Sequence, residues 1–219
     1  MPEESAGAVP EESAGAVLKK CRRKAPEKPG QSRSRQMEHA TMKPLFLIGY
    51  MGCGKSTVGR KLSRRLGWRF ADTDALVEEA EGASVADIFH YEGEERFREV
   101  ERQVLERLIA AAEPVVVSTG GGLPLWHDNM ERMNGSGVTV YLQRSAAGIA
   151  RRLTPYGRRK RPRLRGLSDE ELVPFMERDM ALRAPFYERA QLTLACDALS
   201  DEAALDAVVA RLRADDLVR

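Results

Sequence analysis

The sequence predicts an α/β protein with three layers, in which a parallel sheet of five strands lies between helices on both faces. Five short apolar segments alternate with longer segments whose apolar residues recur at helical spacing, which is the pattern of a covered parallel sheet. The motifs rich in glycine or acidic residues each follow the end of an apolar segment. Because the carboxyl ends of parallel strands meet at one edge, we expect these motifs to form one site there.

The composition narrows the class of protein and its compartment. The 219 residues are 42% hydrophobic, enough for one domain with a buried core and a tail. No apolar run reaches the roughly 18 residues of a membrane span, and the N-terminus lacks the apolar segment of a secretory signal. The three cysteines are scattered without metal or disulfide spacing. We therefore expect a cytoplasmic protein without a membrane partner.

Residues 1–43 are expected to be a disordered, low-complexity extension, and residues 44–219 the folded domain. Residues 2–9 repeat unchanged as residues 10–17, and a basic cluster follows. The extension carries nine Lys and Arg against six Asp and Glu, a net of +3, which leaves the domain near −1. A basic anchor or targeting peptide is one interpretation, and a dispensable extension is favoured because the repeat is acidic. The near-neutral domain disfavours a nucleic-acid partner.

The first predicted strand, at residues 45–48, leads into a phosphate-binding loop with the pattern Gly49-x4-Gly54-Lys55-Ser56. Its glycines let successive backbone N–H groups point at phosphate oxygens, Lys55 suits the β- and γ-phosphates, and the Ser56 hydroxyl suits Mg²⁺. The alternative, a plain glycine-rich turn, leaves Lys55 unexplained. The residues expected to bind ATP here are Gly49, Gly52, Cys53, Gly54, Lys55, Ser56 and Thr57.

An amphipathic helix follows the loop and points its positive end at it. Its apolar residues lie four apart and a glycine stops it: Val58, Leu62, Leu66 and Gly67. A short strand at residues 69–72 comes next and ends in the carboxylate pair Asp72 and Asp74. One carboxylate suits Mg²⁺ through water, and the other suits the proton of an incoming hydroxyl. The alternative is that Asp74 caps a helix at residues 75–80.

A capped turn near Ser84 and a long helix at residues 94–112 precede the third strand, at residues 115–119. The apolar face of that helix comprises Phe97, Val100, Val104 and Leu108. On its polar face Arg98 lies between glutamates four residues before and three after it, so spacing alone favours a solvated ion-pair ladder. Three glycines at residues 120–122 end the third strand and bring bare backbone N–H groups to a small molecule, or form a flexible turn.

A short helix at residues 128–133 precedes the fourth strand, at residues 138–142. Ser145 caps the next helix, and a basic segment occupies residues 155–166. Its arginines suit an RNA-binding patch, a solvated loop or a mobile cationic lid over a triphosphate. The near-neutral domain and the lack of interleaved aromatic residues, apart from Tyr156, disfavour RNA.

The chain ends with a helix, a strand and a helix. Ser168 and Glu171 form a capping-box pattern that opens a helix running to about Arg183, and the fifth strand lies at residues 191–195. The last helix has an apolar stripe made of Ala204, Leu205, Val208, Val209 and Leu212.

Taken together, the motifs from residue 44 to about residue 213 are similar, in order and spacing, to those of the shikimate kinase family. The motifs are Gly49 to Ser56, Asp72-Thr73-Asp74, Phe97-Arg98-x-x-Glu101, Gly120-Gly121-Gly122, Arg161-Pro162 and Arg183-Ala-Pro-x-Tyr187. This resemblance implies a P-loop kinase fold with a mobile lid at about residues 155–166. It also implies ATP-dependent phosphorylation of the 3-hydroxyl of shikimate, giving shikimate 3-phosphate and ADP for chorismate and aromatic amino acid biosynthesis, with Mg²⁺ as cofactor.

The resemblance also implies residue roles. The catalytic residues would be Asp74, Lys55 and Arg161, with Asp74 as base. The residues in contact with shikimate would be Asp74, Arg98, Gly120, Gly121, Gly122 and Arg183, of which the two arginines grip its carboxylate. Arg152 would contact adenine, Arg161 the phosphates, and Mg²⁺ would lie at Ser56 and Asp72. This lid is more basic than is usual in the family, and residues 196–199 lack the family's frequent Arg or Pro, so they receive no role.

Three other functions stay open on the sequence alone. A gluconate kinase-like enzyme shares the architecture and should lack the acidic pair, the Arg98 motif and the glycine triplet. A regulatory module would bind ATP without acceptor-dependent turnover, and an RNA binder would show steep salt dependence. The expected partners are ATP and shikimate, without nucleic acid or membrane, and the expected state is a monomer.

Overall fold

The computed structural model describes residues 43–159 and 161–217. Five strands form one parallel sheet in the order β2-β3-β1-β4-β5, which confirms the predicted fold class. The strands are β1 (Leu45–Ile48), β2 (Arg69–Asp72), β3 (Val115–Ser118), β4 (Val138–Gln143) and β5 (Leu192–Ala195). Their bounds lie within one residue of the predicted segments.

The central strands are buried on both faces, as their continuous apolar runs require. The register places Asp72 of β2 level with Ser118 of β3, and Ile48 of β1 level with Tyr141 of β4. The loops after β1, β2 and β3 therefore leave the same edge of the sheet. This register brings the phosphate-binding loop, the acidic pair and the glycine triplet together.

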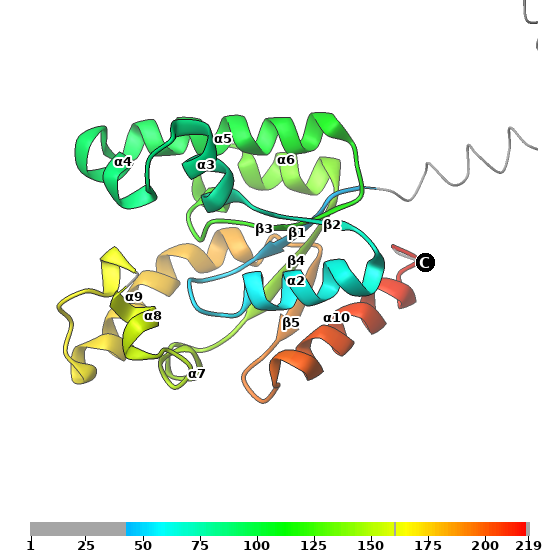
Figure 1. Ribbon diagram of the computed structural model, residues 1–219. Helices are drawn as coiled ribbons and strands as arrows, with labels where there is room; N and C mark the ends of the chain where they lie inside the picture. The colour runs from blue at the N-terminus through cyan, green and yellow to red at the C-terminus, as the bar shows by residue number, and fades with distance from the viewer. Residues whose placement is uncertain (1–42, 160, 218–219) are drawn as a thin grey trace, which may run out of the picture.

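Helices cover both faces of the sheet, with α2 and α10 on one side and α5 and α6 on the other (Figure 1). The helices are α2 (Lys55–Leu66), α3 (Thr73–Glu81), α4 (Val85–Tyr91), α5 (Gly93–Ala111), α6 (Asn129–Ser136), α7 (Ala146–Ala150), α8 (Pro155–Arg159), α9 (Asp169–Tyr187) and α10 (Asp201–Ala214), with the 3-10 turns η1 (Leu123–Leu125) and η2 (Pro162–Leu164). The apolar faces predicted for α5 and α10 are buried in the core.

The predicted helix ends are largely confirmed. Ser84, Ser145 and Ser168 each accept a backbone N–H in the first turn of α4, α7 and α9. Ser168 and Glu171 form the complete capping box, in which each side chain bonds the other's backbone. Gly67 ends α2 in the left-handed conformation, with φ of 68°.

Several elements differ from the prediction. Helix α3 begins at Thr73 rather than at residue 75, so Asp74 lies within its first turn and does not cap it. The basic segment contains α8 and η2, because the Thr154 hydroxyl accepts the Gly157 N–H (3.0 Å) and starts a helical turn. Helix α9 continues beyond Arg183 to Tyr187, whose buried hydroxyl donates to the Gly121 carbonyl (2.6 Å). Helix α6 begins at Asn129 and extends to Ser136, three residues beyond the predicted end, and Gly137 caps it.

The expectation of a disordered extension falls on residues 1–42, which lie outside the described residues, and on Lys43. Within residues 43–159 and 161–217, no helix is both long and apolar enough to cross a membrane. Cys53 and Cys196 are free, buried thiols.

Candidate active site

The phosphate-binding loop bends through three glycines with positive φ, namely Gly49 (143°), Gly52 (84°) and Gly54 (115°). A Cβ added to Gly49 would lie 2.8 Å from the backbone oxygen of Leu142, so the neighbouring strand leaves no room for a side chain. The buried Lys55 ammonium donates to the carbonyls of Gly49 (2.7 Å) and Tyr50 (3.0 Å). The loop therefore holds its cation against its own backbone, beside the curve that suits phosphate oxygens.

Hydroxyl and carboxylate oxygens meet beside the loop. The Ser56 hydroxyl donates to Asp72 Oδ2 (2.9 Å) and lies 3.0 Å from Ser118 Oγ. Such oxygens are the hard ligands that Mg²⁺ prefers, and Mg²⁺ usually takes few protein ligands and completes its shell with phosphates and water. In the described part of the chain, no group of three or more His, Cys, Asp and Glu could hold a metal. The donor set therefore fits a Mg²⁺ that shares its ligands with a nucleotide.

Asp74 lies in the first turn of α3, two residues after Asp72. Between them the buried Thr73 accepts the N–H of Gly120 (2.7 Å), which ties α3 to the glycine triplet. Burial of the carboxyl raises the pKa of Asp74, the charge of Asp72 adds to the rise, and two nearby cations oppose it. Although the residue as a whole is exposed, its carboxyl is crowded, since a Cβ at Gly120 would lie 2.7 Å from Oδ1. Asp74 is therefore an accessible carboxylate of increased basicity.

Two glutamates hold Arg98 on α5. Arg98 Nη1 donates to Glu101 Oε2 (2.6 Å), and Nε and Nη2 donate to Glu94 Oε1 (3.3 and 3.1 Å). The Glu101 side chain is 0% exposed. Burial raises the pKa of Glu101 to about 7, and the Arg98 charge opposes that rise. The ion-pair ladder is present, and Glu101 Oε1 remains a buried acceptor without a hydrogen-bond partner among the described residues.

The glycine triplet leaves room for these charged side chains. A Cβ at Gly122 would overlap the Arg98 guanidinium, and one at Gly120 would overlap the carboxylates of Glu101 and Asp74. At Gly121 the nearest atom would be 3.6 Å away, an ordinary contact. None of the three glycines has a positive φ. Close packing of charged groups, rather than an unusual backbone conformation, therefore favours glycine at positions 120 and 122, because a larger residue would displace these side chains.

Helix α9 contributes Arg183, which is 8% exposed. Its Nη1 donates to the Asp179 carboxylate and to the Asp179 carbonyl (2.9 Å). The guanidinium carbon lies 5.6 Å from the centroid of the Tyr50 ring. One turn later, Tyr187 bonds Gly121 as described above. Helix α9 therefore contacts both the phosphate-binding loop and the glycine triplet, and it places Arg183 beside that loop.

The two arginines predicted on the nucleotide side differ in position. Arg152 Nη2 donates to Asp201 Oδ1 (2.5 Å), and a Cβ at Gly54 would lie 3.9 Å from Arg152 Nη2. Arg152 therefore lies beside the phosphate-binding loop. Arg161 Nη1 donates to the Gly157 carbonyl within the lid segment.

Sequence reasoning gave no role to Ser118, Asp179 and Asp201, which the structure places at the site. Ser118 ends β3, and its place at a strand end was the available signal. Asp179 lies four residues before Arg183, the spacing of a helical ion pair. Asp201 contacts an arginine 49 residues away in the chain, a pairing that no local pattern reveals.

Comparison with known proteins identifies the family. A sequence model of the shikimate kinase family matches residues 51–213. The shikimate kinase of Parabacteroides distasonis is 45% identical over 161 residues, which cover 74% of this chain and 92% of that protein. The shikimate kinase of Phocaeicola vulgatus is 43% identical over 172 residues, covering 78% and 97%.

Solved structures agree. The crystal structure of shikimate kinase from Bacteroides thetaiotaomicron has a TM-score of 0.71 and 40% identity, and covers 79% of this chain and 97% of its own. The shikimate kinase from Acinetobacter baumannii in complex with shikimate has a TM-score of 0.72 and 30% identity, covering 82% and 97%. These matches confirm the resemblance and the P-loop kinase fold, and the chain belongs to the shikimate kinase family.

Proposed function

We propose that this chain transfers the γ-phosphoryl group of ATP to the 3-hydroxyl of shikimate, giving shikimate 3-phosphate and ADP for aromatic amino acid biosynthesis. The observation that carries the proposal is the segment 72–74, which joins two half-sites. Asp72 bonds Ser56 at the end of the phosphate-binding loop, and Thr73 bonds Gly120 of the glycine triplet. Asp74 stands between a phosphate site and a cluster of charged groups suited to a small acid.

Asp74 is the proposed base. Its raised pKa brings its basicity closer to that needed near neutral pH. It would take the proton of the 3-hydroxyl as that oxygen bonds to the γ-phosphorus, while the bond from phosphorus to the bridging oxygen of ADP breaks. Lys55 beside the loop and Arg161 from the lid would meet the charge on the transferring group.

Arg98 and Arg183 are the proposed ligands of the shikimate carboxylate, because guanidinium groups offer two parallel N–H donors to such a group. The side chain of Arg98 is 12% exposed and that of Arg183 is 9% exposed. Their hydrogen bonds to glutamate and aspartate hold both guanidiniums in fixed orientations. Gly120, Gly121 and Gly122 would face the same substrate, and Arg152 would contact adenine.

Ser56 and Asp72 are the proposed Mg²⁺ ligands, because their oxygens already share one hydrogen bond at the loop. Ser118 lies within reach of the same hydroxyl. When bound, Mg²⁺ neutralises charge on the β- and γ-phosphates.

A cytoplasmic monomer that acts on small molecules rather than RNA completes the proposal. Free, buried thiols at Cys53 and Cys196 suit a reducing compartment. Several lid arginines bond their own protein: Arg158 pairs with Asp169, Arg163 with Asp179, and Arg165 with the Arg159 carbonyl. Guanidiniums engaged in this way are less available to a nucleic-acid backbone.

The test is a coupled assay of ADP release with shikimate, with gluconate and without acceptor. We expect turnover only with shikimate. Turnover with gluconate would favour the gluconate kinase-like alternative. ATP binding without any acceptor-dependent turnover would favour a regulatory module and contradict the proposal.

A further inference from the structure

Asp179 is a buried carboxylate on α9 to which the proposed mechanism gives no role beyond orienting Arg183. It is 5% exposed and receives hydrogen bonds from three different parts of the chain. Tyr50 of the phosphate-binding loop donates to Oδ2 (2.7 Å), and Arg163 of η2 donates to Oδ1 (2.8 Å). Arg183 of the acceptor site also donates to Oδ1. One side chain therefore bonds the lid segment, the loop and an acceptor-site arginine.

The cluster of Asp179, Arg163 and Arg183 has more positive than negative charge. Arg163 and Arg183 share a single carboxylate oxygen, so two cations face one anion and the group carries a net charge of +1. A buried carboxylate is stable when its oxygens have donors, and the removal of one partner disturbs the others in the network. The position of Arg163 consequently affects how firmly Asp179 holds Arg183, which is the proposed ligand of an acceptor carboxylate.

Arg163 is also linked to the nucleotide side. It lies two residues after Arg161, the proposed phosphate ligand, on a turn closed by the hydrogen bond from the Leu164 N–H to the Arg161 carbonyl (2.9 Å). Leu164 is 0% exposed, so the turn is anchored in the core. A nucleotide that draws Arg161 toward the loop therefore acts on the same short turn that bonds Asp179.

We propose that Asp179 is a positioning residue that couples the nucleotide site to the acceptor site through Arg163 and Arg183. Bound nucleotide favours the turn position in which Arg163 bonds Asp179, and Asp179 in turn fixes Arg183 for the acceptor carboxylate. This inference rests on the proposed binding of ATP and shikimate. By linkage, each ligand strengthens the binding of the other by the same factor.

The test measures the dissociation constant of shikimate by calorimetry, with and without saturating ADP and Mg²⁺. For the parent chain we expect ADP to tighten shikimate binding about fivefold or more, the lower range of allosteric coupling. Arg163→Gln should reduce the factor by which ADP tightens shikimate binding to below about twofold, because the contact between the turn and Asp179 is lost. Arg163 is 51% exposed, so its removal leaves the core intact.

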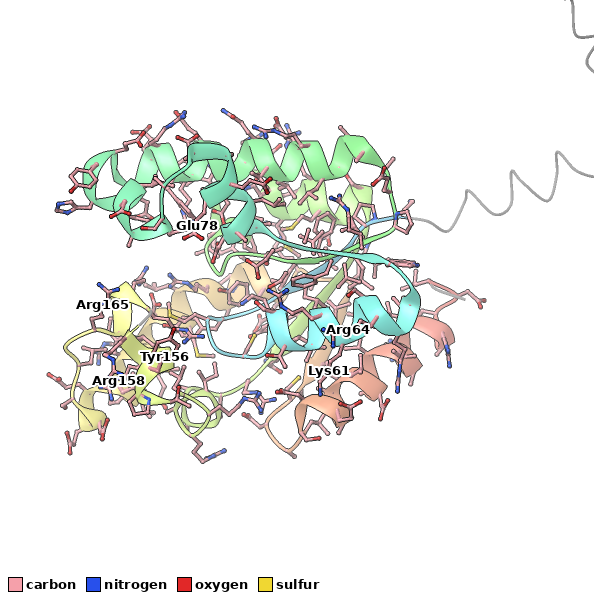
Figure 2. The ribbon with its side chains drawn as sticks, in the orientation of Figure 1. Lys61, Arg64, Glu78, Tyr156, Arg158 and Arg165 are labelled. Carbon is pink, nitrogen blue, oxygen red and sulfur yellow. The ribbon has the colours of Figure 1, made fainter. Side chains whose placement is uncertain are left out.

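Arg165→Gln is the matched control. Arg165 belongs to the same lid segment (Figure 2), and its Nε donates to the Arg159 carbonyl (2.7 Å) rather than to α9. The control should keep the parent factor. Three results would overturn the proposal. ADP could tighten shikimate binding in Arg163→Gln as much as in the parent, the tightening could be lost equally in Arg165→Gln, or ADP could leave shikimate binding to the parent chain unchanged.

Asp179→Asn provides a second arm. It should abolish the coupling and also weaken shikimate binding without ADP, because Arg183 loses its charged partner. Adding Arg163→Gln to Asp179→Asn should then change nothing further, the result expected when two residues act through one contact. Additive losses would contradict the inference. If the parent binds no shikimate at all, the proposed function itself fails, which is a different result from shikimate binding without coupling.

Discussion

As the proposed base, Asp74 would have to attract a proton and remain accessible, and its surroundings suit both needs. The residue is exposed while its carboxyl is crowded and its pKa raised. We expect Asp74→Asn to lower kcat by about 10²–10⁴, the usual contribution of a general base, with a smaller change in KM for shikimate. Steady-state kinetics with each substrate varied separately checks this. A kcat close to that of the parent would leave Asp74 as part of the first turn of α3 only.

Arg98 is held by Glu94 and Glu101, and its role depends on the shape of its guanidinium. Lysine keeps the charge but supplies no parallel pair of N–H donors. We expect Arg98→Lys to weaken shikimate binding by about 1.5–3 kcal/mol, roughly 10- to 150-fold, the range for hydrogen bonds to charged groups. ATP affinity should stay nearly constant. Calorimetric titration with ATP and with shikimate tests this prediction. An equal loss of affinity for both ligands would indicate that Arg98 forms a purely structural ion pair.

Glu101 makes the stability of the fold depend on pH. Burial raises its pKa from 4.5 to about 7, so between these values the folded state holds a proton that the unfolded state releases. The contribution of Glu101 to the free energy of unfolding is therefore highest below pH 4.5 and falls as the pH rises to 7. Glu101→Gln removes this fall, so we expect the variant to gain stability relative to the parent between pH 5 and 8, by up to roughly 3 kcal/mol.

Urea unfolding at pH 5, 6, 7 and 8 measures this difference. Glu99→Gln is the control, because Glu99 lies on the same helix and its side chain is 57% exposed. The control should change little across the series. A Glu101→Gln curve parallel to that of the parent would show that Glu101 stays ionised in the fold throughout.

At the scale of elements, the turn after β3 has a shape set by the charged groups around it. Gly122→Ala places a methyl group inside the Arg98 guanidinium, so we expect Arg98 to move and shikimate affinity to fall about as far as in Arg98→Lys. Gly121→Ala meets only ordinary contacts, and the fold should tolerate it better. Thermal midpoints and shikimate titrations of both variants test this. Equal losses of thermal midpoint in both variants would contradict the steric argument.

The elements best predicted from the sequence carry their own signals. Local apolar spacing and end residues predicted α2, α5 and the capping box of α9, because these depend on neighbours within four residues. The end of α9 was not predicted, because Tyr187 is held by Gly121, 66 residues away. The short helix α8 was not predicted either. It begins where the Thr154 hydroxyl accepts the N–H of Gly157, and the basic composition of the segment gives no sign of this.

The candidate site shows the same division. The phosphate-binding loop, the acidic pair and the glycine triplet could be predicted, because each follows a strand and parallel strands end at one edge. Asp179 could not, because its role depends on Tyr50, Arg163 and Arg183 meeting at one carboxylate. The spacing of Glu101 from Arg98 predicted an ion-pair ladder on the surface, and only the fold shows that Glu101 is buried.

At the scale of the whole molecule, the first strand is joined to the rest of the domain from its first residues. The Pro44 carbonyl accepts the N–H of Val138, and Leu45 is 1% exposed. The family match begins later, at residue 51. The contacts that hold the central strand β1 in the sheet therefore start at Pro44, and the preceding residues are predicted to be dispensable for catalysis.

A chain that begins at Met42 tests this prediction. We expect it to keep the thermal midpoint and to keep kcat/KM within tenfold, about 1.4 kcal/mol, because every described strand and its partners remain. A chain that begins after Phe46 is the matched control. It loses Leu45 and Phe46, which are 1% and 0% exposed, and each such burial contributes about 1.5–3 kcal/mol. Their combined loss of about 3–6 kcal/mol reaches the lower end of the stability of an ordinary domain, about 5–15 kcal/mol, and the central strand keeps only two of its four residues, so the thermal midpoint of the control should fall sharply. A loss beyond tenfold in the Met42 chain would show instead that the extension packs on the domain or regulates it.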